Sequence, residues 1–263
     1  MMVSALKRTV QRAVPGPYSA LQRVWQGRID RQKRRIWQTL VAGNGDRVMQ
    51  GPFAGLYYPS ATLGIFPTAR LLGSFESELH PVVERICATR YDTIIDVGCA
   101  EGYYAVGFAL RMPWAQVYAY DIDETARARC AELARANGVG DRVHIGGAFD
   151  PRVLHGWATA RTLLWSDCEG CEVDILRPDL APEERAFDLI VELHDFLRPG
   201  AKGTIVERFT GSHDITIIRG CERDRRAYPA LASLRARDQR LALSELRPVT
   251  MEWAVMMAQQ RVA

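Results

Sequence analysis

Residues 93–102 read Thr-Ile-Ile-Asp-Val-Gly-Cys-Ala-Glu-Gly, and this stretch decides the fold. Its apolar residues predict a short buried strand, and the glycines after it predict a tight turn into a helix. Gly98 and Gly102 allow the backbone to come close to a ligand, because a Cβ would obstruct that approach. Asp96 places a carboxylate at the end of the strand. The stretch therefore predicts a ligand-binding turn.

The spacing of these glycines narrows the choice of ligand. A dinucleotide fingerprint, G-x-G-x-x-G, would need glycine where Ala100 and Tyr103 stand. This disfavours a nicotinamide-dependent oxidoreductase and a pyrophosphate-containing ligand. An acid before Gly-x-x-x-Gly resembles instead the first motif of class I S-adenosylmethionine (SAM) methyltransferases. The resemblance implies a ligand that carries an amino acid and a nucleoside.

A second apolar strand, residues 117–120, ends at Asp121. An acid about 20 residues past the glycine turn is where doubly wound folds hydrogen-bond a ribose. The alternative role for Asp121 is to cap the helix predicted over 124–136, but Asp123 lies closer to the start of that helix. We therefore expect Asp121 to bind the ribose.

Alternating apolar strands and helical stretches predict the fold class. Further strands are expected at 142–145, 162–166, 187–191, 213–218 and 252–257. The pattern predicts an α/β fold with a parallel-type sheet, helices on both faces and a final antiparallel hairpin. The resemblance to class I methyltransferases implies that this sheet is Rossmann-like, with seven mostly parallel strands. A further helix is expected to reach about residue 89, with Ser74 as its N-cap and acids 76 and 78 in its first turn.

The predicted cofactor site gathers around the first three strand ends. The loop Gly146-Gly147-Ala148 is expected to receive a flat ring. The residues expected to bind the cofactor are Glu76, Asp96, Gly98, Cys99, Ala100, Gly102, Tyr103, Asp121, Ile122 and Ala148.

Ionisable side chains follow the fourth and fifth strands: Asp167, Glu192 and His194. In open α/β sheets ligands lie beyond the carboxyl ends of the strands. A hydroxyl nucleophile must lose its proton, and a histidine within reach is suited to receive it. We therefore expect these three to be catalytic and to surround the acceptor oxygen. Two alternatives remain open: a structural imidazole, and a divalent metal site, which is not favoured.

Two segments carry a more specific resemblance. Residues 167–176 resemble the Asp-x-Glu-Gly-x-Glu-x-x-x-Leu signature of FkbM-like SAM-dependent methyltransferases, and residues 190–194 resemble the end of their fifth strand. With Asp96 and Gly98 the resemblance covers roughly residues 70–220. It implies methyl transfer, usually to a hydroxyl oxygen of a small molecule, sugar or lipid-linked glycan, and implies that Glu76 reaches the amino group of the cofactor. Ala100 departs from the usual second glycine of the first motif.

Six scattered cysteines in a chain of 263 residues indicate reduced thiols rather than a disulfide framework. Cys168-x-x-Cys171 is a weak candidate for a redox motif or half of a zinc site. No run of 18 apolar residues and no apolar leader is found near the N-terminus, so we expect a cytoplasmic protein.

Residues 1–40 carry a formal charge of +8 in a chain of net charge +3. We expect residues 1–50 to form a basic helical N-terminal extension and residues 51–263 to form the methyltransferase domain. The basic helix either packs on the domain, which we favour, or docks on anionic lipid or nucleic acid. The competing functions are therefore a nucleic-acid methyltransferase, which is unlikely, and a non-catalytic SAM-binding or membrane-associated partner protein.

Overall fold

The computed structural model describes residues 17–157 and 161–259. Its strands are β1 (Thr93–Val97), β2 (Gln116–Tyr120), β3 (Val143–Gly146), β4 (Thr162–Ser166), β5 (Asp188–Leu193), β6 (His213–Arg219) and β7 (Glu252–Ala258). Its α-helices are α2 (Pro17–Asn44), α3 (Ser60–Leu63), α4 (Thr68–Leu72), α5 (His80–Cys87), α6 (Tyr103–Arg111), α7 (Glu124–Ala136), α8 (Glu172–Ile175), α9 (Ala201–Phe209) and α10 (Ala236–Leu243). Its 3-10 helices are η1 (Ser77–Leu79), η2 (Pro151–Trp157), η3 (Pro182–Ala186), η4 (Arg225–Ala227) and η5 (Pro229–Ser233).

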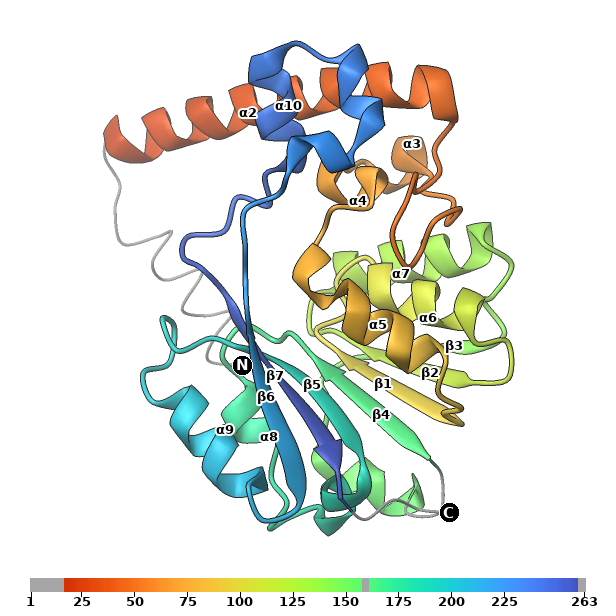
Figure 1. The fold of residues 1–263 in the computed structure, drawn as a ribbon, viewed down its shortest axis with the longest axis vertical. Helices are drawn as coiled ribbons and strands as arrows, with labels where there is room; N and C mark the ends of the chain where they lie inside the picture. Colours follow the sequence, from red (N-terminus) through yellow and green to blue (C-terminus); the bar gives the residue numbers. More distant parts are fainter. Residues whose placement is uncertain (1–16, 158–160, 260–263) are drawn as a thin grey trace.

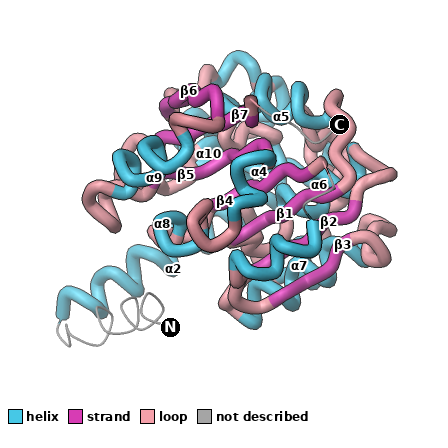
Figure 2. The backbone as a smooth tube through the Cα atoms, turned by 90° about the horizontal axis from the view of Figure 1, so that it is seen from below, coloured by secondary structure: helices cyan, strands magenta, loops and turns pink. Residues whose placement is uncertain are grey.

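The strands form one seven-stranded sheet in the order β3-β2-β1-β4-β5-β7-β6. The neighbours from β3 to β5 pair in parallel, and β7 pairs antiparallel with both β5 and β6. Figure 2 shows β3 and β6 at opposite ends of this sheet. The predicted class I methyltransferase fold is therefore confirmed. The antiparallel pair is confirmed too, but a long connection holding η4, η5 and α10 joins it, not a tight hairpin turn.

Helices cover both faces of the sheet, as expected (Figure 1). On one face α5, α6 and α7 pack over a core that includes Ile94, Val117 and Leu163. On the other face α8, α9, η2 and η3 pack over Ile95, Leu164 and Leu189. Consecutive residues of a strand point to opposite faces, so β1 and β4 contribute to both cores. This explains why both strands are apolar throughout apart from a few polar positions.

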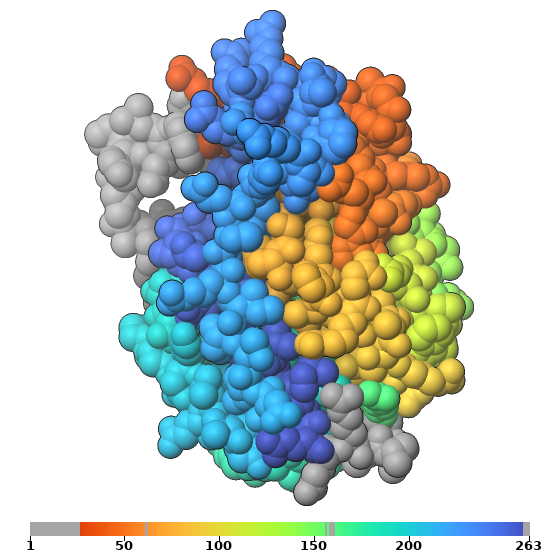
Figure 3. Space-filling view, in the orientation of Figure 1, coloured from red at the N-terminus to blue at the C-terminus, as the bar shows by residue number. Residues whose placement is uncertain are grey.

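A helical layer made of α2, α3, α4 and α10 lies beyond one edge of the sheet in Figure 1. The segment after β6 runs up into this layer and returns as β7, so the layer lies at the carboxyl ends of the parallel strands. Figure 3 shows the segment after β6 (blue) beside the earliest residues that are coloured in that view (orange). The edge at the carboxyl ends of the parallel strands is therefore covered by chain from early and late parts of the sequence.

Helix α2 is anchored in this layer. Its residues Ile36, Trp37 and Leu40 are buried in the same core as Ile94, Val117 and Leu163. Lys33 Nζ donates a hydrogen bond of 3.1 Å to Ser244 O, and Gln32 Nε2 donates one of 2.6 Å to Asp238. These contacts show that residues 32–40 pack on the domain. Docking of the basic arm on anionic lipid or nucleic acid, the alternative that we did not favour, is not tested by these contacts, and residues 1–16 of the arm lie outside the described part of the chain. Among the described residues, no helix is long and apolar enough to cross a membrane.

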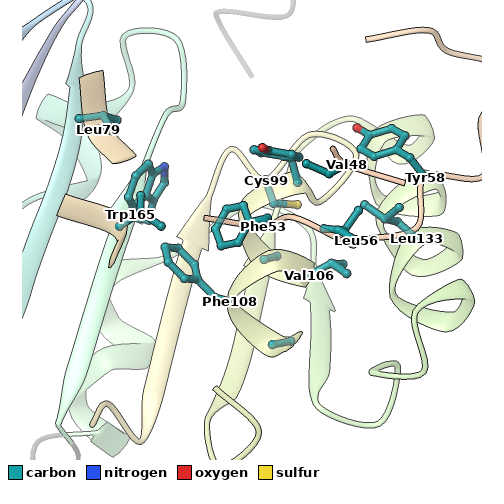
Figure 4. Packing of buried hydrophobic residues seen from close by; sticks show 14 of the residues in the cluster. Val48, Phe53, Leu56, Tyr58, Leu79, Cys99, Val106, Phe108, Leu133 and Trp165 are labelled. Atoms are coloured by element: carbon teal, nitrogen blue, oxygen red, sulfur yellow. The ribbon is translucent and has the colours of Figure 1, made fainter. Parts of the chain in front are cut away.

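Residues 45–76 bridge from α2 to the sheet. Figure 4 shows Val48, Phe53 and Leu56 of this segment above α6. A Cβ on Gly107 of α6 would lie 2.6 Å from the ring of Phe53, so the glycine lets this ring lie on the helix. The segment thus carries aromatic side chains to the carboxyl edge of the sheet.

The prediction that Ser74 caps a helix was wrong. Ser74 Oγ bonds to Ala69 O at 3.2 Å, and α5 begins only at His80 after the short helix η1. Glu76 has a left-handed backbone (φ 48°) and stands before η1, and Glu78 lies within η1 and pairs with Arg223 at 2.6 Å. The two acids are held by arginines distant in sequence rather than by the dipole of a helix.

Candidate active site

The turn after β1 is held by backbone hydrogen bonds. Gly98 N and Cys99 N both donate to Tyr120 O, at 2.8 and 3.0 Å. Gly98 (φ 87°), Ala100 (φ 48°) and Gly102 (φ 93°) all have left-handed backbone conformations. Alanine adopts this conformation reluctantly, so the hydrogen bonds must hold the turn in shape.

Packing requires glycine at both positions, and their role in leaving room for a cofactor stays a prediction. A Cβ on Gly98 would overlap the carbonyl group of Asp167, which lies on the neighbouring strand end. A Cβ on Gly102 would lie 2.7 Å from Cys130 Sγ in α7. A side chain at either position would therefore push protein groups apart before it met any ligand.

Asp121 binds the turn itself. Its Oδ2 accepts a hydrogen bond of 3.0 Å from Ala100 N, and its Oδ1 accepts one of 2.8 Å from Asp123 N. Asp123 caps α7 by accepting from Thr125 N at 2.7 Å, as expected. Next to Asp121, the side chain of Ile122 is 60% exposed, and Ala148 is exposed as well. These residues form an outer strip beside the turn.

Asp96 is buried at the bottom of a small cavity. Within the described chain its Oδ2 has no hydrogen-bond partner. Burial, followed by the nearby Asp167 carboxylate, raises the pKa of Asp96 to about 8. The cavity measures about 30 Å³, and its walls are Arg70, Phe75, Asp96, Gly98, Cys99, Ala100, Tyr103, Tyr104, Trp165 and Asp167. The Tyr104 ring lies 4.0 Å from the Trp165 ring and helps to close the cavity.

The three predicted catalytic residues lie together. His194 Nε2 is 3.5 Å from Asp167 Oδ1 and 3.6 Å from Glu192 Oε2. His194 and Glu192 are buried, and the Asp167 side chain is 37% exposed. Burial, with Asp167 as the next cause, raises the pKa of Glu192 above its ordinary value despite the opposing effect of Arg247. The cluster is thus a dense group of acids around one imidazole.

Glu172 holds the imidazole from behind. His194 Nδ1 lies 2.8 Å from Glu172 Oε1, which also accepts hydrogen bonds from Cys168 N and Gly170 N. Because a carboxylate faces Nδ1, the proton of the neutral ring belongs on that nitrogen. Burial alone would lower the pKa of His194, but the bond to Glu172 and the other carboxylates raise it. Glu172 was not among the predicted site residues, although the quoted signature contains it.

Arg247 is a second residue that the sequence analysis missed. It pairs with Glu192 Oε1 and Glu76 Oε1, and its Nε lies 2.8 Å from Glu245 Oε2. Glu76 also accepts a hydrogen bond of 2.5 Å from the hydroxyl of Tyr104. Burial raises the pKa of Glu76, with Arg247 opposing that rise. Glu76 is therefore engaged by protein groups and does not line the small cavity.

A larger cleft of about 1010 Å³ opens on the other side of Arg247. It lies between the chain that leaves β6 and the chain that enters β7. Its walls include Glu78, Arg223, Arg225, Arg240, Glu245, Arg247, Val249 and Trp253. The cluster of acids and His194 thus lies between a small cavity under the glycine turn and a wide, arginine-rich cleft.

Cys168 and Cys171 form a disulfide. The expectation that all six cysteines are reduced thiols was therefore wrong. The other four, Cys87, Cys99, Cys130 and Cys221, are free. The disulfide closes the short loop whose backbone donates to Glu172, so the two cysteines have a structural task that spacing alone did not reveal.

No known family profile matches the sequence, and no curated protein matches it. Among solved structures, a Klebsiella pneumoniae protein assigned as an O-methyltransferase has a TM-score of 0.48 at 11% identity, covering 97% of both chains. TomG of Streptomyces achromogenes, an O-methyltransferase of tomaymycin synthesis solved with SAM, has a TM-score of 0.45 at 12% identity, covering 87% of this chain and 90% of TomG. Precorrin-6y C5,15-methyltransferase from Geobacter metallireducens has a TM-score of 0.46 at 11% identity, covering 70% and 88%.

Proposed function

We propose that this protein is a SAM-dependent methyltransferase that methylates a hydroxyl oxygen of a small molecule, sugar or lipid-linked glycan. One observation carries the proposal: Asp167 lines the cavity under the glycine turn and also lies 3.5 Å from His194 Nε2. The predicted cofactor turn and the acid–base cluster therefore adjoin at a single residue. Methyl transfer requires such proximity, because donor and acceptor must meet in line.

The residues of the turn suit SAM. The buried Asp96 Oδ2 has a cationic partner to gain, and the amino group of the methionine part of SAM is such a partner. The cavity of about 30 Å³ is far smaller than the ~300–1,000 Å³ of typical small-molecule sites. It has room for a group about the size of a water molecule, such as the amino group of the methionine part. The nucleoside end would lie outside, along Asp121, Ile122 and Ala148.

The cluster would act on the acceptor. When bound, SAM supplies an electrophilic methyl group, so the chain has to position the hydroxyl and remove its proton. Glu172 keeps the proton of His194 on Nδ1. Nε2 is thereby left to accept the proton of the hydroxyl, while Arg247 holds Glu192 in place. The cleft of about 1010 Å³ beside Arg247 offers room for a large acceptor.

We include the FkbM-like family in the proposal. Its signature resemblance runs through Asp167, Glu172, Glu192 and His194, and these are the residues that meet in the cluster. A function for two of the three acids of the signature, Asp167 and Glu172, supports the resemblance. The identity of the acceptor is a matter for screening hydroxylated sugars and lipid-linked glycans with labelled SAM.

Calorimetry of the full chain tests the cofactor part of the proposal. SAM should bind, and Asp121→Ala should weaken SAM and its demethylated product about equally, because both carry the same ribose. Asp141→Ala, which removes an exposed carboxylate outside the site, is the matched control and should bind as the wild type does. Absence of SAM binding to the folded wild type would refute the proposed function.

A further inference from the structure

We infer that Asp167, Glu192 and His194 form a binding site for a divalent metal ion. One ligand atom from each of the three lies within 4.8 Å of the others. His194 Nε2 stands 3.5 and 3.6 Å from the two carboxylate oxygens. An ion about 2.0–2.2 Å from each ligand atom separates neighbouring ligands by roughly 3.0–3.5 Å, so only a small closure of the cluster is required.

The histidine is oriented as a metal ligand. The side chain of His194 is only 3% exposed, and its Nδ1 lies 2.8 Å from Glu172 Oε1. Histidine ligands nearly always donate their second ring N–H to a carboxylate or carbonyl, which fixes the tautomer. Here this contact directs the lone pair of Nε2 toward Asp167 and Glu192. Nε2 lies within ion-pair distance of a carboxylate oxygen of each of these two acids, so the three ligand atoms face one another.

The two carboxylates are also oriented as metal ligands. Arg247 engages Oε1 of Glu192, while Oε2 faces the imidazole. Asp167 is the most exposed of the three ligands and lines the cavity. An ion bound here would therefore be reachable from solvent and would keep positions open on the side of the cavity.

Charge supports the same conclusion. Asp167, Glu192 and Glu172 surround one imidazole, and Arg247 is shared with Glu76 and Glu245. Buried carboxylates carry a large desolvation cost unless cations compensate them. A divalent cation supplies that compensation. Two oxygens and one nitrogen suit Mn²⁺ best, with Mg²⁺ preferring an all-oxygen set and Zn²⁺ preferring more nitrogen or sulfur.

The catalytic role of the ion rests on the proposed function. A bound ion would coordinate the acceptor oxygen and lower the pKa of its hydroxyl. His194 would then hold the metal, and the hydroxyl proton would pass to solvent or to a carboxylate at the edge of the cluster. Metal binding itself requires neither SAM nor acceptor, so it can be measured separately.

The experiment titrates Mn²⁺ into the EDTA-treated full chain and follows it by electron paramagnetic resonance. We expect one Mn²⁺ per chain and a nitrogen coupling from His194. Asp167→Asn and Glu192→Gln should each weaken binding at least 10-fold, and His194→Ala should also remove the nitrogen coupling. Glu172 positions His194, and Glu172→Gln keeps the shape of that side chain while removing its charge. This variant should weaken Mn²⁺ binding by ~10- to 100-fold. Asp214→Asn, an exposed acid of β6, is the matched control.

The outcomes separate the two proposals. Three results would overturn the metal site and leave the methyltransferase proposal standing. The first is that none of Mn²⁺, Mg²⁺ and Zn²⁺ binds, and the second is that Asp167→Asn, Glu192→Gln and Asp214→Asn bind Mn²⁺ with equal affinity. The third is full methyl transfer after EDTA treatment. Metal binding without SAM binding would support the site and refute the methyltransferase. Circular dichroism of each variant establishes whether it is folded. If a variant of a direct ligand does not fold, Glu172→Gln still tests the metal site.

Discussion

The two sides of the candidate site are held by different kinds of interaction. The glycine-turn side is made of backbone contacts within residues 96–123, such as those of Gly98 N and Cys99 N with Tyr120 O. The strand-end side is made of ionisable side chains from distant parts of the chain, with Arg247 joining Glu76 to Glu192. A site made of local backbone leaves a pattern in the sequence. A site made of long-range ion pairs leaves very little.

The largest effect on stability is expected at Gly98, where the backbone of the glycine-turn side contacts the backbone of the strand-end side. Gly98→Val would place a side chain on the carbonyl of Asp167, in a conformation that favours glycine. We expect the free energy of unfolding to fall by more than about 4 kcal/mol, or folding to fail altogether. Denaturant unfolding measures this.

Gly147→Ala is the control for that substitution. No atom lies within 4 Å of the Cβ it would add, so its stability should stay within about 0.5 kcal/mol of the wild type. If Gly98→Val folded with wild-type stability and lost only SAM binding, Gly98 would serve the cofactor after all, and our account of the turn would be wrong.

How much the sequence predicted follows the same division. Helix α7 and strand β4 were predicted with their observed bounds, since apolar periodicity and Asp123 mark them locally. On the strand-end side, the meeting of Asp167, Glu192 and His194 is the exception that could be predicted, because adjacent parallel strands end at one edge.

The failures concern contacts that no local pattern marks, most of them between residues distant in the sequence. Ser74 resembled a helix cap, but the acids after it are held by Arg223 and Arg247, more than 140 residues away. The Cys168–Cys171 disulfide was missed because the number and spread of cysteines describe the whole chain and do not show which two meet in one loop. Glu172 was passed over since nothing local shows that it meets His194.

On the strand-end side, His194→Ala should cut methyl transfer by ~100- to 10,000-fold, whether the imidazole accepts a proton or holds an ion. SAM affinity should stay close to that of the wild type, because the turn does not depend on His194. Labelled SAM with an identified acceptor measures turnover, and calorimetry measures binding. Wild-type turnover in His194→Ala, Glu192→Ala and Asp167→Ala alike would show that the strand-end side is not catalytic.

A smaller effect is expected from the loop that supports Glu172. Replacing Cys168 and Cys171 by serine removes a cross-link that closes a very short loop, which is worth about 2 kcal/mol in the chain-entropy description. The freed loop should also hold Glu172 less firmly, since Cys168 N and Gly170 N both donate to it. Thermal unfolding compares this variant with Cys221→Ser, which removes an exposed free thiol. Equal stability of the two variants would contradict a structural role for the disulfide.

The last prediction concerns pH and the glycine-turn side. The carboxylates at the strand ends are paired with Arg247 or His194, whereas Asp96 Oδ2 has no donor among the described residues. Burial and the neighbouring Asp167 raise the pKa of Asp96 from 3.8 to about 8. Between these pH values the folded chain retains a proton on Asp96 that the unfolded chain has lost.

Stability should therefore fall as pH rises through that interval, by up to about 1.4 kcal/mol per pH unit, and become insensitive to Asp96 above pH 8. Asp96→Asn cannot ionise, so its stability should lack this slope and exceed that of the wild type on the alkaline side. Urea unfolding between pH 5 and pH 9 compares the two chains. Because the amino group of SAM would supply the missing cationic partner, saturating SAM should flatten the wild-type curve toward that of the variant. Parallel curves for wild type and variant would mean that Asp96 is already ionised in the folded chain, and that the two sides of the site are equally well compensated.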